Sequence, residues 1–326
     1  METRVLSKTD VERLNSIGAQ RSKRMDADGV GEKLGYWFDR QLEQIMERTY
    51  EERRQPRNAL EIFNRDDSIS RGATSYTHRI KSFRGKAKII EDYGEKLPRV
   101  DVVRDEFPRP IKDIGTSYEI TVREAMSAMH SGDSLETDRG QSAREAIEDK
   151  HNDLFWDGEE DLDVWGFNSH PYVPRYGFSQ SLDYTTNANT IIAELNEFIS
   201  QPRLLTDKQI SPDTLLLPTE LFEIVSSTRV PDTQITILQH LEQANPHLSE
   251  GSIRQVPELD GKGENGEDLC GVFRNRTDTI KLVAPILADE LSPQMEALIT
   301  KVPFLASNGG MYIARPKEVV IGVVPN

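Results

Sequence analysis

The stretch "AREAIEDKHNDLFWDGEEDLDVWGFNSHP", residues 143–171, contains the end of a helical pattern and the turn that follows it. Apolar residues recur at helical spacing up to Trp156, and Gly158 then interrupts the pattern, which predicts a helix over residues 135–157. At ~1.5 Å per residue this helix would span about 30 Å, enough to serve as the spine of a domain. The residues expected to share one stripe of the helix are Ala143, Ala146, Ile147, Lys150 and Leu154.

Five carboxylates crowd into the turn after this helix, which raises the question of a calcium site. Asp161, Asp163 and Gly166 match the first, third and sixth positions of a calcium-binding loop. Trp165 and Tyr172, however, stand at the fifth and twelfth positions, where the loop needs oxygen ligands. The pattern therefore excludes a calcium loop of this type.

Other motifs that carry chemistry are also missing from the sequence. The six histidines are scattered and form neither His-Glu-x-x-His nor a Cys-x-x-Cys partner set for zinc. There is no Gly-x-Ser-x-Gly elbow, no phosphate-binding loop and no dinucleotide fingerprint. The adjacent carboxylates Glu159 and Glu160 are expected to be solvated rather than catalytic. We therefore predict no catalytic, cofactor-binding or metal-binding residues, and we do not expect an enzyme.

Composition and charge narrow the class of protein further. Cys270 is the only cysteine, which rules out a disulfide within the chain, and neither a signal pattern nor a membrane-spanning run is found. Residues 1–110 carry 23 Lys/Arg and 20 Asp/Glu, whereas residues 111–326 carry 17 and 35. This acidic balance argues against a sequence-reading nucleic-acid binder. It suits contact between one chain's basic front and a neighbour's acidic body, or simply solubility. We expect a soluble, cytoplasmically made protein.

The front of the chain has patterns that need a partner surface. Residues 33–54 have helical spacing of apolar side chains without an evident partner face, and residues 72–110 alternate as in two long strands. A two-stranded ribbon of this length has too little core to be stable alone. Four basic residues surround Gly85 at its turn, and they are expected to be solvated or to face protein rather than phosphate. They are Lys81, Arg84, Lys86 and Lys88.

The remaining segments predict mixed helices and strands, an α+β body. Thr121 and Glu124 form a predicted capping box for a helix, and Thr233 or Asp232 is the expected cap of another. Helices are expected over 189–200 and 219–227, and a buried strand over 212–218. The Asn-Gly-Gly stretch 308–310 predicts a hairpin.

Six segments of the chain cover the ribbon, the spine helix, a strand of the body and the C-terminus. In order, they are "FRGKAKIIEDYGEKLPRVDV", "TSYEITVREAMSAMHSGDSLE", "AREAIEDKHNDLFWDG", "DVWGFNSHP", "PDTLLLP" and "NGGMYIARPKEVVIGVV". Together, in this order, they resemble the major capsid proteins of tailed bacteriophages, which have the Hong Kong 97-type capsid fold and are related to encapsulin shells. The resemblance spans residues 33–326.

The resemblance implies a particular domain organisation. The expected parts are an N-terminal arm at 1–71, an extended β-hairpin loop at 72–110, a peripheral domain at 111–184 with the spine helix 135–157, an axial domain at about 185–285, and a return to the peripheral domain at 286–326. The acidic stretch would then be a turn after the spine helix. Gly158 would end the helix, Gly166 would adopt a left-handed conformation, and Trp165, Phe167 and Pro171 would pack the turn down.

The implied function is assembly into pentamers and hexamers that form an icosahedral shell around phage double-stranded DNA. Scaffolding, portal and decoration proteins are the implied partners, DNA is enclosed without sequence-specific contacts, and no membrane is involved. The chain would be made in the host bacterial cytoplasm and end in the virion. The alternatives are an encapsulin-like compartment shell that encloses cargo enzymes, and a cytosolic enzyme with an unrecognised site.

Two sets of residues are expected at contacts between subunits. The first set consists of the apolar residues Tyr36, Phe38 and Leu42, and the second of the basic residues around Gly85. In some relatives a loop lysine bonds covalently to a neighbour's asparagine, which would make Lys81, Lys86 or Lys88 a donor and Asn308 an acceptor. Because no carboxylate for such a reaction is identifiable, electrostatic contact is the favoured interpretation.

Overall fold

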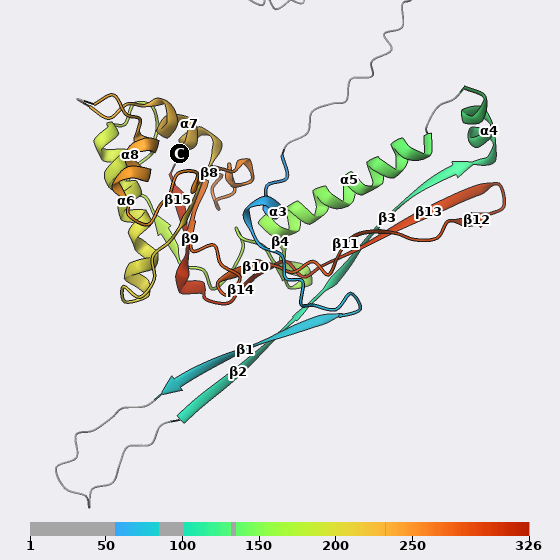
Figure 1. Ribbon diagram of the computed structural model, residues 1–326, viewed down its shortest axis with the longest axis horizontal. Helices are drawn as coiled ribbons and strands as arrows, with labels where there is room; N and C mark the ends of the chain where they lie inside the picture. Colours follow the sequence, from blue (N-terminus) through green and yellow to red (C-terminus); the bar gives the residue numbers. More distant parts are fainter. Residues whose placement is uncertain (1–55, 85–100, 132–134, 232, 326) are drawn as a thin grey trace, which may run out of the picture. The chain divides into compact units, whose positions relative to one another are not determined.

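A computed structural model describes residues 56–84, 101–131, 135–231 and 233–325 (Figure 1). The predicted helix at 33–54 and the turn around Gly85 lie outside these residues. Within them, the chain is α+β, as predicted, and no helix is long and apolar enough to cross a membrane.

The spine helix α5, Leu135–Trp156, lies along an antiparallel sheet, as Figure 1 shows. The long strands β3 (Lys112–Thr121) and β13 (Ile299–Asn308) pair over ten residues each. The other edge of β13 pairs with β11 (Ile286–Glu290) and β12 (Gln294–Glu296). Side chains of α5 and β13 form the small core between helix and sheet: Ala143, Ile147, Val302, Phe304 and Ala306.

The predicted extent of α5 is confirmed, but its predicted stripe needs correction. Ala143, Ile147 and Leu154 are buried, whereas Ala146 and Lys150 are exposed. The buried line continues through His151, which is 2% exposed. Residues four apart share a helix face, so His151 follows Ile147 into the core.

A second sheet has the order β6-β15-β9-β7-β8. Its strands are β6 (Arg175–Gly177), β15 (Val319–Val324), β9 (Asp268–Phe273), β7 (Thr214–Leu217) and β8 (Ile253–Gln255). Three helices pack with it: α6 (Ala188–Leu205), α7 (Thr219–Ser227) and α8 (Ile237–Ala244).

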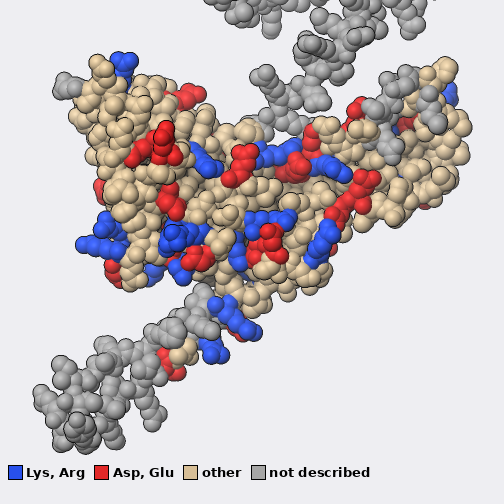
Figure 2. Space-filling model, viewed as in Figure 1, with Lys and Arg blue, Asp and Glu red and all other residues tan. Residues whose placement is uncertain are grey.

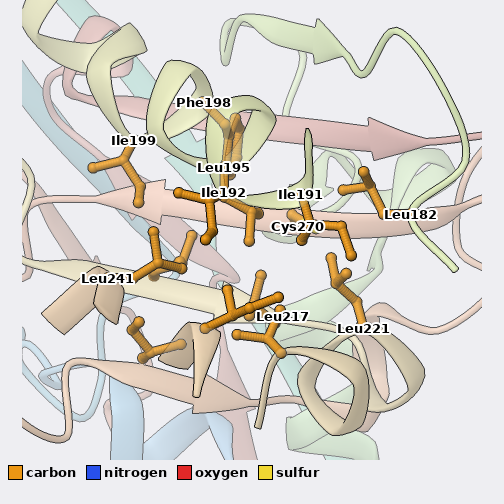
Figure 3. Close-up of a cluster of buried hydrophobic side chains, with 14 of the residues drawn as sticks. Leu182, Ile191, Ile192, Leu195, Phe198, Ile199, Leu217, Leu221, Leu241 and Cys270 are labelled. Carbon is orange, nitrogen blue, oxygen red and sulfur yellow. The ribbon is translucent and has the colours of Figure 1, made fainter. Parts of the chain in front are cut away.

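The largest core lies between these helices and the sheet. Ile191, Leu195 and Phe198 of α6 are fully buried against strand residues such as Leu217 and Cys270 (Figure 3). Burial raises the pKa of the Cys270 thiol well above its usual range, so this cysteine behaves as a small apolar core residue.

The two sheets are joined through a cluster of aromatic side chains. Phe63, which follows the short helix α3 (Ala59–Ile62), contacts the rings of Trp156, Phe167 and Phe273 at centroid distances of 5.3–5.7 Å. These rings come from four separate segments of the chain. Their mutual packing holds the end of α5 against β9 of the second sheet.

Helix capping agrees with the sequence at one of the two predicted caps. Thr121 and Glu124 form the predicted capping box of α4 (Val122–Ser131), with both reciprocal hydrogen bonds at 3.0–3.2 Å. The cap of α8 is Thr236, not Thr233 or Asp232, because Gln239 stands three residues later and completes a capping box with Thr236. The hydroxyl of Thr233 donates instead to the carbonyl of Val230.

The hairpin predicted at Asn308-Gly309-Gly310 is wrong. Strand β14 (Met311–Ile313) pairs with β10 (Ile280–Leu282) and not with β13. Gly309 donates to the Val283 carbonyl and Gly310 accepts from the Val283 amide, at 2.8 and 3.0 Å. The glycines therefore pass the chain from one sheet to another strand instead of folding it back.

Candidate assembly surfaces

The predicted two-stranded ribbon is present between residues 75 and 110. Strands β1 (Ser75–Arg84) and β2 (Asp101–Pro110) pair antiparallel from Ser75 opposite Pro110 to Arg84 opposite Asp101. Its contacts with the sheets lie at its base, and Figure 1 shows the strands leading away from there. Val102 and Phe107 are 42% and 37% exposed. The ribbon therefore offers apolar side chains that its own chain does not cover.

The residues predicted at subunit contacts lie largely outside the described structure. Tyr36, Phe38, Leu42, Lys86 and Lys88 fall in segments that the structure does not describe. For Lys81 and Arg84 only the backbone is described; in the ribbon they pair with Arg104 and Asp101. Their role in assembly stays a prediction.

Asn308, the residue predicted as a covalent acceptor, is completely buried. Its Oδ1 accepts a hydrogen bond from the Gly310 amide at 2.6 Å. Its Nδ2 lies 2.8 Å from His151 Nδ1. Both ends of this side-chain amide are thus engaged inside the subunit.

The turn after α5 is held by glycines and an aromatic ring. Gly158 has φ of 73°, as expected of a glycine that ends a helix. Gly166 was predicted to be left-handed, and it is not. The position requires glycine because a Cβ there would collide with the Trp156 carbonyl. Phe167 is fully buried as predicted, but Pro171 is exposed, so it does not pack the turn down.

Three of the five carboxylates of this turn take part in ion pairs. Asp157 pairs with Lys262 at 2.6 Å, and Glu159 pairs with Lys150 at 3.2 Å. Asp163 lies 3.5 Å from Arg109 of the ribbon. Among the described residues, no group of three or more His, Cys, Asp or Glu is arranged to hold a metal ion. The geometry of the acidic stretch is that of a connecting turn.

An aromatic pocket of about 360 Å³ lies at the base of the ribbon. We call it the hairpin pocket. Its walls come from β1, β2, the turn after α5, and the segment from β14 to the short helix Pro316–Glu318. The lining residues are Tyr76, His78, Phe107, Arg109, Trp165, His170, Tyr172, Met311, Tyr312, Ile313, Ala314, Pro316 and Lys317.

Stacked rings and one arginine give the hairpin pocket its character. The Arg109 guanidinium lies 3.1 Å from the centroid of the Trp165 ring. His78 stacks on Phe107 at 5.2 Å and contacts Tyr312 at 4.7 Å. These contacts attach the ribbon to the rest of the subunit through cation–π and ring packing.

Burial and the Arg109 charge keep the pocket's histidines neutral. Burial, with a smaller contribution from Arg109, lowers the pKa of His170 to about 4. The same two causes, with Lys281 third, lower the pKa of His78. Burial also raises the pKa of Tyr76. At neutral pH the pocket is therefore an apolar aromatic surface whose fixed charge is cationic.

A second surface feature lies where β12 turns into β13. Met295 and Leu298 are 77% and 71% exposed, and the neighbouring Ile299 is also exposed. The Leu298 carbonyl accepts from the Val122 amide, which places the start of α4 and its exposed Met126 at the same end. Figure 2 shows mostly uncharged side chains there. We call Met126, Met295, Leu298 and Ile299 the distal patch.

The fold of this chain is similar to that of solved phage and phage-like capsid structures. The capsid of Myoviridae phage XM1 matches with a TM-score of 0.77 at 11% identity, over 88% of this chain and 98% of that chain. The capsid of a native GTA particle matches with a TM-score of 0.62 at 10% identity, over 92% of this chain and 100% of that chain. The chain from Gordonia phage Cozz matches with a TM-score of 0.59 at 12% identity, over 92% of this chain and 96% of that chain. No curated protein matches. The fold is the Hong Kong 97-type capsid fold.

The sequence itself assigns the family. The model of the major capsid protein family matches residues 85–322, and the chain belongs to that family. It is thus a tailed-phage head-shell protein, and its place is in the capsid of the virion. These findings favour the phage capsid over the encapsulin-like compartment. The family is one of structural proteins, which agrees with the expectation that the chain is not an enzyme.

Proposed function

We propose that copies of this chain assemble into pentamers and hexamers, which close into the icosahedral head shell around phage double-stranded DNA. The observation that carries the proposal is the β1–β2 ribbon, whose contacts with the sheets lie at its base while Val102 and Phe107 stay exposed. A two-stranded ribbon is marginal in water, so it gains stability by lying on a neighbouring subunit. Many modest contacts of this kind add up in a closed shell.

We assign five parts to the subunit. They are an arm at 1–71, an extended loop at 72–110, a peripheral domain at 111–184 with α5 as its spine, an axial domain at 185–285, and a return segment at 286–326. The large core around α6 supports the axial assignment. Strand pairing favours adding β6 and β15 to that domain, because both strands belong to its five-stranded sheet. The sheet under α5 supports the peripheral one.

The proposed partners follow from the role of a shell wall. Scaffolding and portal proteins would direct closure, and decoration proteins would bind outside. DNA would be enclosed without base-specific contacts, since a formal net charge of −15 disfavours tight binding to phosphate. Synthesis would take place in the cytoplasm of the host bacterium, without a membrane partner.

Electron microscopy of the expressed full-length chain, alone and with the scaffolding protein of its phage, tests this function. We expect shells, tubes or capsomers with five- and six-fold symmetry. Sedimentation that gives only a 37.0 kDa species under every condition, infected cells included, would rule the proposal out.

A further inference from the structure

The hairpin pocket is open although its walls are apolar. Its volume, about 360 Å³, falls within the ~300–1,000 Å³ typical of sites that receive a ligand or side chain. Tyr172 of the lining is 61% exposed, and the Arg109 guanidinium lies over the ring of Trp165. His78 Nδ1 is buried in this structure without a hydrogen-bond partner. The pocket therefore offers aromatic faces and a cation to an incoming group.

The distal patch is convex, whereas the hairpin pocket is concave. Strands β12 and β13 pair up to Glu296 opposite Ile299, so only Ala297 and Leu298 make the turn. Ala297 has φ of 54°, a left-handed conformation that a non-glycine residue adopts at a cost. This narrow turn presents Met295 and Leu298 to solvent. It is a convex, exposed apolar feature of the kind that marks a contact with a partner surface.

The two features match in chemistry as well as in form. A methionine thioether packs favourably against aromatic rings, and leucine fills apolar gaps between them. Glu296 stands beside Met295 on the turn, whereas the exposed Lys317 lies in the lining of the pocket. Arg109, also in the lining, already lies 3.5 Å from Asp163. Insertion would thus bring the Glu296 carboxylate toward Lys317.

The features lie on different parts of the chain. The lining of the hairpin pocket includes no residue of the distal patch, and the high exposure of Met295 and Leu298 shows that they are not inserted into their own subunit. A contact between two different patches of identical chains is head-to-tail. Such contacts close into rings when the rotation permits.

We propose that the hairpin pocket receives the β12–β13 turn of a second copy of this chain. Met295 and Leu298 lie against the aromatic walls, and Glu296 faces Lys317 at the rim. This inference rests on the proposed function, because it requires copies held side by side in a shell.

Cysteine pairs test the contact directly in assembled shells. The variant carries Met295→Cys and Lys317→Cys, and shells are treated with a short bismaleimide before a denaturing gel. Cys270 does not compete, since it is fully buried. The matched control combines Met295→Cys with Leu204→Cys, because Leu204 is 57% exposed, lies on α6 and belongs neither to the lining of the hairpin pocket nor to the distal patch. Mixed shells that contain wild-type chain serve if the double variant assembles poorly.

We expect a ladder of linked oligomers from the 295/317 pair, and little linkage from either single variant or from the 295/204 control. A dimer formed by Met295→Cys alone would mean that two turns meet each other, and would overturn the proposal. Intact shells without a 295/317 ladder would also overturn it and leave the pocket to another occupant. Failure of the proposed function would show differently, as absence of shells from the wild-type chain.

Discussion

The Nδ1 atom of His151 lies 2.8 Å from the amide nitrogen of Asn308, in the buried space between α5 and the end of β13. His151 Nε2 lies 2.9 Å from the Leu287 carbonyl, which can only accept, so Nε2 carries the proton and Nδ1 accepts from Asn308. Burial lowers the pKa of His151, and the hydrogen bond to Leu287 opposes this in part. A neutral histidine thus connects the spine helix to two strands.

We expect the subunit to lose stability as the pH falls below about 6.5, the ordinary pKa of histidine. The pKa of His151 is lowered, and that of His170 is lowered to about 4. The unfolded chain therefore takes up protons that the folded chain does not, and the free energy of unfolding decreases with falling pH. At about 1.4 kcal/mol per pKa unit, His170 alone contributes at most about 3 kcal/mol by pH 4.

Urea unfolding of the unassembled subunit at several pH values between 4 and 7.5 measures this loss. His170→Gln and His151→Gln should flatten the dependence, even if they lower stability at pH 7.5. The matched control is His130→Gln, since His130 is exposed. A wild-type subunit as stable at pH 5 as at pH 7.5 would contradict the prediction.

Gly166→Ala should destabilise the subunit by about 3 kcal/mol or more, because the new methyl group would meet backbone atoms of residues 156–158 that cannot move away. Thermal unfolding measures the effect. Gly177→Ala is the control, as a Cβ there meets nothing within 4 Å. Equal melting temperatures for the two variants would show that the turn is not packed as described.

Local patterns in the sequence predicted local structure well. The extent of α5, the Thr121–Glu124 capping box and the β1–β2 ribbon depend on residues close in sequence, and all are confirmed. The hairpin prediction at 308–310 failed because these glycines lead into a long-range pairing of β14 with β10, which no nearby residue reveals.

The hairpin pocket shows the same limit for the site. Arg109 and Trp165 are 56 residues apart and meet only because the ribbon base lies on the turn after α5. The distal patch has a weaker signal in the sequence: the apolar residues Met295 and Leu298 stand in and beside a turn, where polar residues are normal. That signal was readable in the sequence, but its partner surface was not.

Arg109→Ala should loosen the ribbon from the subunit. Loss of the cation–π contact with Trp165 costs about 0.5–2 kcal/mol, and the ribbon base loses its fixed orientation. We expect a small decrease in melting temperature with a larger decrease in shell yield. Arg79→Ala provides the control, because Arg79 forms an exposed pair with Glu106 further along the ribbon. Equal shell yields from both variants would argue against an anchoring role for Arg109.

The basic residues of the ribbon turn give the last prediction, which rests on sequence alone. If the turn contacts a neighbour's acidic body, changing Lys81, Arg84, Lys86 and Lys88 together to Glu should weaken assembly through repulsion. Changing the same four residues to Gln should weaken assembly less, and high salt should act on the wild type in the same direction.

Particle yield for the three chains at low and high salt measures the effect, and a denaturing gel of wild-type particles separates it from covalent linkage. A ladder of oligomers after boiling in detergent and reductant would show that lysines are bonded rather than paired. The burial of Asn308 and the engagement of both ends of its amide argue that this asparagine is not the acceptor of such a bond. Assembly of the Glu variant at wild-type yield would refute the electrostatic contact, because a change of eight charges per chain cannot leave an attractive ion contact intact.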